Sequence, residues 1–276
     1  MGRTPAVAAV RTDGRPRGAR RTRFRFRLLS GVGIGIGLLA WQLGVSLNPT
    51  SLIPGPLVVA RGIGELASRG LLVRYVVASL FRVTWGYLSA LVVAIPLGML
   101  LGVKRPAELA LNPILQILRP ISPLAWIPIA ILWFGVGDVS AIFLIFLASL
   151  LPLTTATSNA VRNIDPVHFA AARNFGVPAK QRVFDVLLLA ILPQLIVAMR
   201  ISLGVAWLVV VAAEMIAVNS GLGFLIVDAR NAGNRYDLVI AGMVLIGAIG
   251  LALDLLMRRL ERLDSVRWGY VEESAR

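Results

Sequence analysis

The stretch Ala170–Gln181, AAARNFGVPAKQ, interrupts one of the most apolar regions of the chain. It holds two basic residues, a glycine and a proline, and it lies between long apolar runs at 141–161 and 186–218. Glycine commonly ends a helix, and proline suits the first turn of the next one. We therefore expect a short helix over 167–175, a turn at Gly176 and a second helical turn after it.

The flanking composition is that of a membrane protein. Of the 276 residues, 57% are hydrophobic and only 15% are charged, whereas soluble domains carry about a quarter charged residues. The mean hydropathy is +0.80. A soluble fold of this size would have to expose apolar side chains over its whole surface. The composition therefore predicts an all-α polytopic membrane protein.

Apolar runs predict about six transmembrane helices, since about 20 apolar residues are needed to cross the hydrocarbon. The chain divides into a basic tail at 1–27, expected to be disordered, a transmembrane domain at 28–257 and a C-terminal tail at 258–276. The predicted spans are 28–47, 79–102, 111–134, 141–161, 186–218 and 238–257.

The distribution of basic residues predicts the orientation. The formal net charge is +14, but the basic residues cluster in the tails and in short loops, and no basic stripe interleaved with exposed aromatics indicates a nucleic-acid surface. With the N-terminus inside, 20 Lys and Arg fall on the cytoplasmic side and 5 on the outer side. This bias predicts that both termini and the segment 162–185 are cytoplasmic. Arg82 is then expected to reach the outer headgroups, so that its charge does not require burial.

The third span is unusual because it holds Pro113, Pro120, Pro123 and Pro128. Prolines break the helical hydrogen-bond ladder, so this span must be bent or broken. Freed carbonyls, together with Ser122 and Trp126, would then line a watery path, or the bend would only improve helix packing; both interpretations stay open.

Charges within the predicted spans are costly and face a partner or a water-filled path. Arg200 and Glu214 lie 14 residues apart on one helix, too far apart for direct contact, so each needs a partner on another helix. Arg119 is a candidate partner for Glu214. Whether Arg119 and Glu214 form an inter-helix pair or line the path of an anionic substrate is left open. Asp254 is expected to pair with Arg258 one turn further on.

Several chemistries are excluded by the residues present. There is no cysteine and only one histidine, His168, so thiolate sites, histidine metal clusters and a conventional Ser-His-Asp triad are excluded. We expect no metal site and no catalytic residues. The glycine-rich run 31–37 lacks the Lys-Ser/Thr ending of a phosphate loop, and its small residues four apart predict close helix packing instead.

The opening stretch also resembles a known motif, the EAA loop of bacterial ABC importer permeases. That loop begins Glu-Ala-Ala, continues to a glycine and ends in an apolar-Pro pair entering the next helix. Ala171, Ala172 and Gly176 match it, as does Leu192-Pro193, but Ala170 replaces the motif glutamate and Leu189 a frequent proline. The expected coupling residues are Ala170, Ala171, Ala172, Arg173, Gly176, Val177 and Pro178.

Other stretches between about residues 50 and 270 resemble the nitrate/sulfonate/taurine branch of these permeases. They are Ile53–Pro56, Leu118–Pro128, Ile131–Gly135, Arg200–Trp207, Ala213–Met215, Asn219–Gly223 and Arg267–Trp268.

The resemblance implies a type I importer permease fold, like that of MetI, in the bacterial inner membrane. It also implies a partner set: a second copy of the chain, two cytoplasmic ABC ATPase subunits and an extracytoplasmic substrate-binding protein. ATP would be used by the partner, because the chain lacks a Walker A sequence and is expected to bind no cofactor and catalyse no reaction.

The function that this implies is ATP-driven import of a small anion, namely an aliphatic sulfonate, taurine or nitrate. One alternative is import of another small ligand, such as a pyrimidine precursor, by the same permease type. A secondary transporter is a further alternative, although two related halves are usual there and the sequence shows no clear internal repeat.

Overall fold

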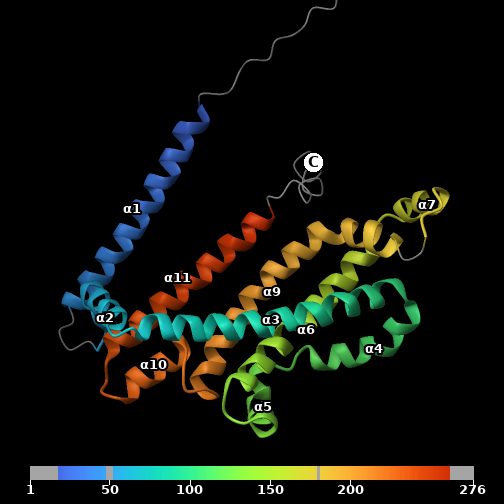
Figure 1. Cartoon of the computed structure of the whole chain (residues 1–276). Coiled ribbons are helices and arrows are strands. Elements are labelled where there is room, and N and C mark those ends of the chain that lie inside the picture. The colour runs from blue at the N-terminus through green and yellow to red at the C-terminus, as the bar shows by residue number, and fades with distance from the viewer. Residues whose placement is uncertain (1–17, 48–51, 179–180, 262–276) are drawn as a thin grey trace, which may run out of the picture. The chain divides into compact units, whose positions relative to one another are not determined.

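The computed structural model describes residues 18–47, 52–178 and 181–261, and all regular structure within them is helical (Figure 1). The elements, in chain order, are α1 Gly18–Leu47, α2 Pro56–Ser68, α3 Leu71–Val103, α4 Arg105–Leu118, the 3-10 turn η1 Pro123–Trp126, α5 Ile127–Phe134, α6 Asp138–Arg162, α7 Pro166–Asn174, the π-helical turn η2 Arg182–Leu187, α9 Leu188–Ile216, α10 Leu222–Asn231 and α11 Tyr236–Leu260.

The chain separates into two units, Met1–Leu57 and Val58–Arg276. The first unit holds α1, which begins at Gly18, so the disorder expected for 1–27 is wrong from Gly18 onward. Residues 1–17 lie outside the described part of the chain. The close packing expected at the glycines of 31–37 stays a prediction.

The second unit holds four helices that are long and apolar enough to cross a membrane: α3, α6, α9 and α11. The pair formed by α4 and the segment Pro123–Phe134 passes the same test as one broken span, bent by 86°. The bend expected from the prolines of the third span is therefore confirmed. The described helices give four or five spans; the further span expected at 28–47 lies in α1, whose apolar part, Gly31–Leu47, is shorter.

Small residues bring α3 and α6 into close contact. A β-carbon added at Gly86 would lie 2.7 Å from the β-carbon of Ile145, and one added at Gly98 would lie 2.6 Å from that of Thr157. In lipid, the hydrophobic effect does not favour contact between helices, so close packing is needed instead. Small residues allow the two backbones to approach closely enough for it. This contact forms the centre of the bundle.

The helix α9 completes the core against α3 and α11. The Tyr87 hydroxyl donates to the Met199 carbonyl at 2.7 Å, which joins α3 to α9. The Trp207 indole donates to the Ile246 carbonyl at 3.1 Å, which joins α9 to α11. Aromatic donors satisfied in this way allow large rings to pack inside a membrane bundle.

Two ends of the bundle can be defined from these contacts. At the first, called the α7 end, Arg162 at the end of α6 donates to the Leu101 carbonyl near the end of α3, at 3.1 Å. At the other, called the α10 end, Gly137 before α6 donates to the Ala217 carbonyl after α9, at 2.9 Å.

A partly exposed ion cluster fastens α2 to the start of α11. Arg235 lies 2.6 Å from the Glu65 carboxylate and 2.7 Å from that of Asp237. The Arg235 guanidinium lowers the pKa of Glu65 below its ordinary value of 4.5, and the two carboxylates raise the pKa of Arg235.

This cluster predicts a pH dependence of stability. Because the folded-state pKa of Glu65 is depressed, its contribution is fully present above 4.5 and is lost as the pH falls through the lower folded value. The difference in thermal midpoint between wild type and Glu65→Gln should therefore stay constant from neutral pH to about pH 5 and shrink below it. Asp228→Asn, which removes an exposed carboxylate on α10, is the control. A difference that had already vanished near pH 6 would contradict the pairing.

Candidate functional site

The short helix α7 is capped at its start by its own sequence. The Asp165 side chain accepts a hydrogen bond from the Val167 backbone N–H at 2.9 Å, and Pro166 occupies the first helical position. Both features are typical of helix N-termini, because they satisfy or remove N–H groups that lack a partner within the helix.

The end of α7 is a Schellman motif, as the glycine and the residues around it predict. The Val177 N–H donates to the Ala172 carbonyl, and the Gly176 N–H donates to the Arg173 carbonyl, both at 3.0 Å. Gly176 adopts φ 69°, a left-handed conformation that favours glycine. The structure therefore places a helix and a sharp turn where the sequence predicts them.

The outer face of α7 is exposed and partly apolar. Phe175 is 86% exposed and Val167 is 66% exposed. Ala170, Ala171 and Arg173 are also exposed, whereas Ala172 is buried. A large ring left this open beside small residues is a surface suited to contact with another molecule.

The inner face of α7 is anchored to the bundle. Phe169 packs against a buried cluster made of Ala160 and Val161 from α6 together with Leu187 and Ile191 from the η2–α9 region. A displacement of α7 would therefore be passed to α6 and α9, the two helices that the segment connects.

The intramembrane charges pair differently from the expectation. Glu214 does not pair with Arg119: it is 0% exposed and lies 2.6 Å from the guanidinium of Arg82. Arg82 is 1% exposed, a burial that the sequence did not predict. It lies within α3, which begins at Leu71 rather than at 79, and it faces α9, the start of α6 and the α9–α10 turn.

The Arg82–Glu214 pair belongs to a fully bonded network at the α10 end. The Glu214 carboxylate also accepts from the Ser79 hydroxyl at 2.9 Å and from the Gly223 N–H at 3.0 Å. Arg82 donates to Asp138 and to the Ser220 carbonyl, each at 2.8 Å. One buried pair therefore joins α3, the start of α6 and the α9–α10 turn.

Arg200, on α9, packs beside the end of α11, which carries Asp254. Arg200 donates to both oxygens of Glu261, at 3.0 and 3.1 Å, and lies 3.6 Å from Asp254. Asp254 accepts from Arg258 at 2.7 Å, so the expected one-turn pair is confirmed. These contacts account for the charge of Arg200 without a substrate.

Ser122 and Trp126 lie at the break in the third span. The Ser122 hydroxyl accepts from the Leu124 N–H at 3.3 Å, which caps η1, and Trp126 is half-buried against the main core. Their contacts in this structure are those of a helix break.

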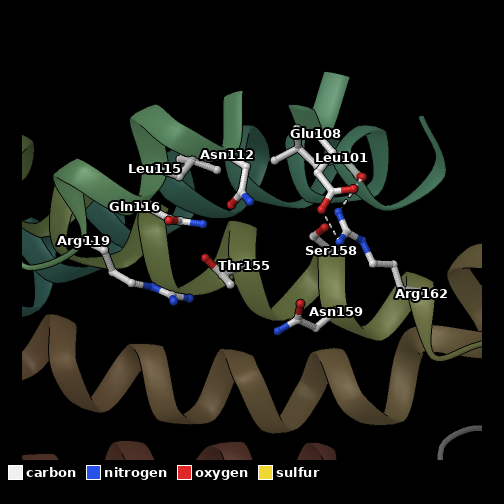
Figure 2. Close-up of a pocket in the computed structure, with 10 residues that line it drawn as sticks. All are labelled: Leu101, Glu108, Asn112, Leu115, Gln116, Arg119, Thr155, Ser158, Asn159 and Arg162. Carbon is white, nitrogen blue, oxygen red and sulfur yellow. Dashed lines mark hydrogen bonds and ion pairs between the residues drawn. The ribbon is translucent and has the colours of Figure 1, made fainter. Parts of the chain in front are cut away.

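Arg119 borders a polar cavity of about 310 Å³ between α4 and α6 (Figure 2). Sequence reasoning missed the polar residues that accompany it. Their signal is present, because Glu108, Asn112, Gln116 and Arg119 recur at helical spacing in an otherwise apolar run. The cavity is lined by Leu101, Glu108, Asn112, Leu115, Gln116, Arg119, Thr155, Ser158, Asn159 and Arg162.

The described part of the chain is a multi-pass helical bundle with an anchored, outward-facing short helix between two of its long apolar helices. Residues 94–263 match the family described as binding-protein-dependent transport system inner membrane component, and the chain belongs to this family.

Relatives and a solved structure agree with this assignment. The chain is 35% identical to the putative aliphatic sulfonates transport permease protein SsuC of Bacillus subtilis, over 80% of this chain and 81% of that protein. It is 36% identical to the taurine transport system permease protein TauC of Escherichia coli, over 68% of each. It resembles a chain of the inward-facing MetNI methionine ABC transporter with a TM-score of 0.62 and 25% identity, over 70% of this chain and 95% of that one.

The fold class expected from the sequence is therefore confirmed: the protein is an all-α, multi-pass membrane permease subunit of the MetI type. Its relatives are transport permease subunits, and it belongs with ABC importer assemblies.

Proposed function

We propose that this chain forms the membrane path of an ATP-driven importer for a small anion, with α7 as the element that couples it to the ATPase. The observation that carries the coupling role is the geometry of α7. The helix is capped at both ends, presents Phe175 and Val167 to solvent and is anchored through Phe169 to two spans. Such an element can receive a force outside the membrane and pass it inward.

Ala170 bears on how α7 would contact its partner. A methyl group stands where the family motif has a carboxylate, so no acidic side chain is available at that position. Contact would rest on the exposed ring of Phe175, the shape of the Gly176 turn and the charge of Arg173, all of which are accessible.

The anionic nature of the substrate is supported from two sides. Relatives are named for sulfonate and taurine transport. Within this chain, the cavity beside Arg119 holds two arginines and one carboxylate. Nitrate, taurine and aliphatic sulfonates are therefore the first candidates.

The proposed assembly contains two copies of this chain, two ABC ATPase subunits and an extracytoplasmic binding protein in the bacterial inner membrane. The α7 end faces the cytoplasm together with both termini, in agreement with the excess of basic residues there. ATP is bound and hydrolysed by the partner, and this chain holds no cofactor of its own.

Thermal stabilisation of the cognate binding protein tests the substrate class. We expect nitrate, taurine or an alkanesulfonate to raise its melting temperature by several degrees at millimolar concentration, because binding only to the folded state stabilises it. A ligand present at about 100 times its Kd contributes about 2.7 kcal/mol. Uptake of the same ligand into proteoliposomes holding the full complex should require ATP. If only a pyrimidine stabilises the binding protein, the substrate belongs to the alternative ligand class and is not one of these anions.

The same proteoliposomes separate an importer from a secondary transporter. Accumulation of substrate on an ion gradient, by this chain without ATPase subunits, would contradict the proposal.

A further inference from the structure

The helix α4 has its polar and apolar faces reversed relative to a surface helix of a water-soluble protein. Its polar side chains line the cavity toward α6, in which Gln116 and Arg119 stay open to solvent, whereas Ile114 and Ile117 are exposed on the other side. The facing stretch of α6 supplies Thr155 and Asn159 (Figure 2). Polar groups turned inward within a membrane bundle indicate a water-filled cavity or a bound polar ligand.

The charges in this cavity are unbalanced. Arg162 pairs with Glu108 and also donates to the Leu101 carbonyl at 3.1 Å. Arg119 has no ion-pair partner among the residues that the structure describes. In Figure 2 its guanidinium extends into the cavity on the side of Thr155. The cavity therefore carries one uncompensated positive charge.

The remaining polar groups are neutral and able to donate hydrogen bonds. They are the amides of Asn112, Gln116 and Asn159 and the hydroxyl of Ser158, whereas the Thr155 hydroxyl already donates to the Leu151 carbonyl at 2.9 Å. A guanidinium offers a fixed fork of donors that matches an oxyanion, and amides and hydroxyls can complete its hydrogen bonds. The single carboxylate is already paired, so a ligand's cationic group would find no free partner in the cavity.

We propose that the cavity between α4 and α6 is a binding site for a small oxyanion, held by Arg119 and by the amides of Gln116, Asn112 and Asn159. At about 310 Å³ it has the volume of roughly ten water molecules. It accommodates one small oxyanion with several waters. The identification of the ligand as the transported anion rests on the proposed function. The same chemistry fits a phosphate headgroup of an anionic lipid, since basic pockets between transmembrane helices bind such headgroups.

The depth of the site suits a point of release. Arg119 lies 11 residues beyond Glu108, roughly 16 Å along the helix from the α7 end. An anion bound there would leave toward the end that carries α7. The paired Arg162 and Glu108 mark that end of the cavity.

Arg119→Gln in the complete permease–ATPase complex tests the site. In nanodiscs of zwitterionic lipid, nitrate, methanesulfonate and taurine are titrated against chloride at equal ionic strength, and thermal stability is measured. Wild type should be stabilised saturably, and Arg119→Gln should raise the Kd about tenfold or more, because it removes a charge-assisted hydrogen bond. Arg105→Gln, the same substitution at an exposed position of α4, should keep the wild-type Kd.

A second arm identifies a lipid occupant. In nanodiscs containing phosphatidylglycerol, native mass spectrometry should show retained anionic lipid on wild type and Arg105→Gln but not on Arg119→Gln if a headgroup fills the site. If neither free anions nor retained lipid distinguishes Arg119→Gln from Arg105→Gln, the inference is overturned.

ATP-driven uptake measured in parallel separates this inference from the proposed function. Normal uptake without binding that depends on Arg119 overturns the oxyanion site and leaves the importer intact. Oxyanion binding that depends on Arg119, in a complex that shows no ATP-driven uptake, leaves the site intact and overturns the importer.

Discussion

Gly176→Pro should abolish ATP-driven uptake while the chain still inserts into the membrane. Gly176 holds φ 69°, and its N–H donates to the Arg173 carbonyl at 3.0 Å. Proline fixes φ near −65° and has no N–H, so the turn cannot keep its shape. Forcing an unsuitable residue into such a conformation costs on the order of 1–3 kcal/mol. This strain is confined to the end of α7, so the membrane-spanning helices should still form and insert.

The chain offers a close control for this change. Gly70, between α2 and α3, has φ 70°, donates to the Ala67 carbonyl at 3.0 Å, and has open space around it just as Gly176 has. Gly70→Pro therefore imposes a similar backbone strain at a position away from α7. We expect it to keep a normal ratio of transported substrate to hydrolysed ATP, whereas Gly176→Pro brings that ratio to near zero.

Three measurements decide the outcome: membrane insertion, retention of the ATPase subunit on the purified permease, and uptake per ATP hydrolysed. Gly176→Ala, which keeps the N–H but strains the left-handed turn, should give an intermediate loss. Normal uptake by Gly176→Pro would show that α7 is not the coupling element. Equal loss of coupling in both proline variants would assign the effect to general destabilisation.

Features encoded locally in the sequence were predictable. The apolar runs predicted α3, α6, α9 and α11, because the bilayer selects for length and hydropathy. The four prolines of the third span predicted its break, which the structure shows as an 86° bend. Gly176 predicted the end of α7, because a C-cap acts on the backbone within one turn.

Features that depend on contacts between distant segments were not predictable in the same way. Hydropathy gives an estimate of the depth of Arg82 in the membrane. It cannot show that Arg82 faces Glu214, which is 132 residues away in the sequence. The expected partner, Arg119, instead borders the polar cavity between α4 and α6, beside the bend of the third span. The glycines that allow α3 to approach α6 likewise have meaning only once the two helices are paired.

The network around Arg82 leads to the second large expected effect. Arg82→Met leaves the fully buried Glu214 without its guanidinium partner, and Asp138 loses a contact at 2.8 Å. Removing one member of a buried ion pair costs about 3–5 kcal/mol, because the remaining charge stays desolvated. We expect much lower expression and a lower melting temperature of the purified chain. Arg258→Met, which breaks the exposed pair with Asp254, should change the melting temperature little.

The double variant Arg82→Met/Glu214→Gln distinguishes a charge effect from lost packing. Without either charge, no ion remains buried at this position, so the double variant should be more stable than Arg82→Met alone. The amide can still accept from Ser79 and Gly223, which hold the carboxylate at 2.9 and 3.0 Å. If the double variant expresses well but transports poorly, the pair also acts in opening the α10 end, since it joins α3 to the α9–α10 turn there. If Arg82→Met is as stable as wild type, the network does not hold these helices together.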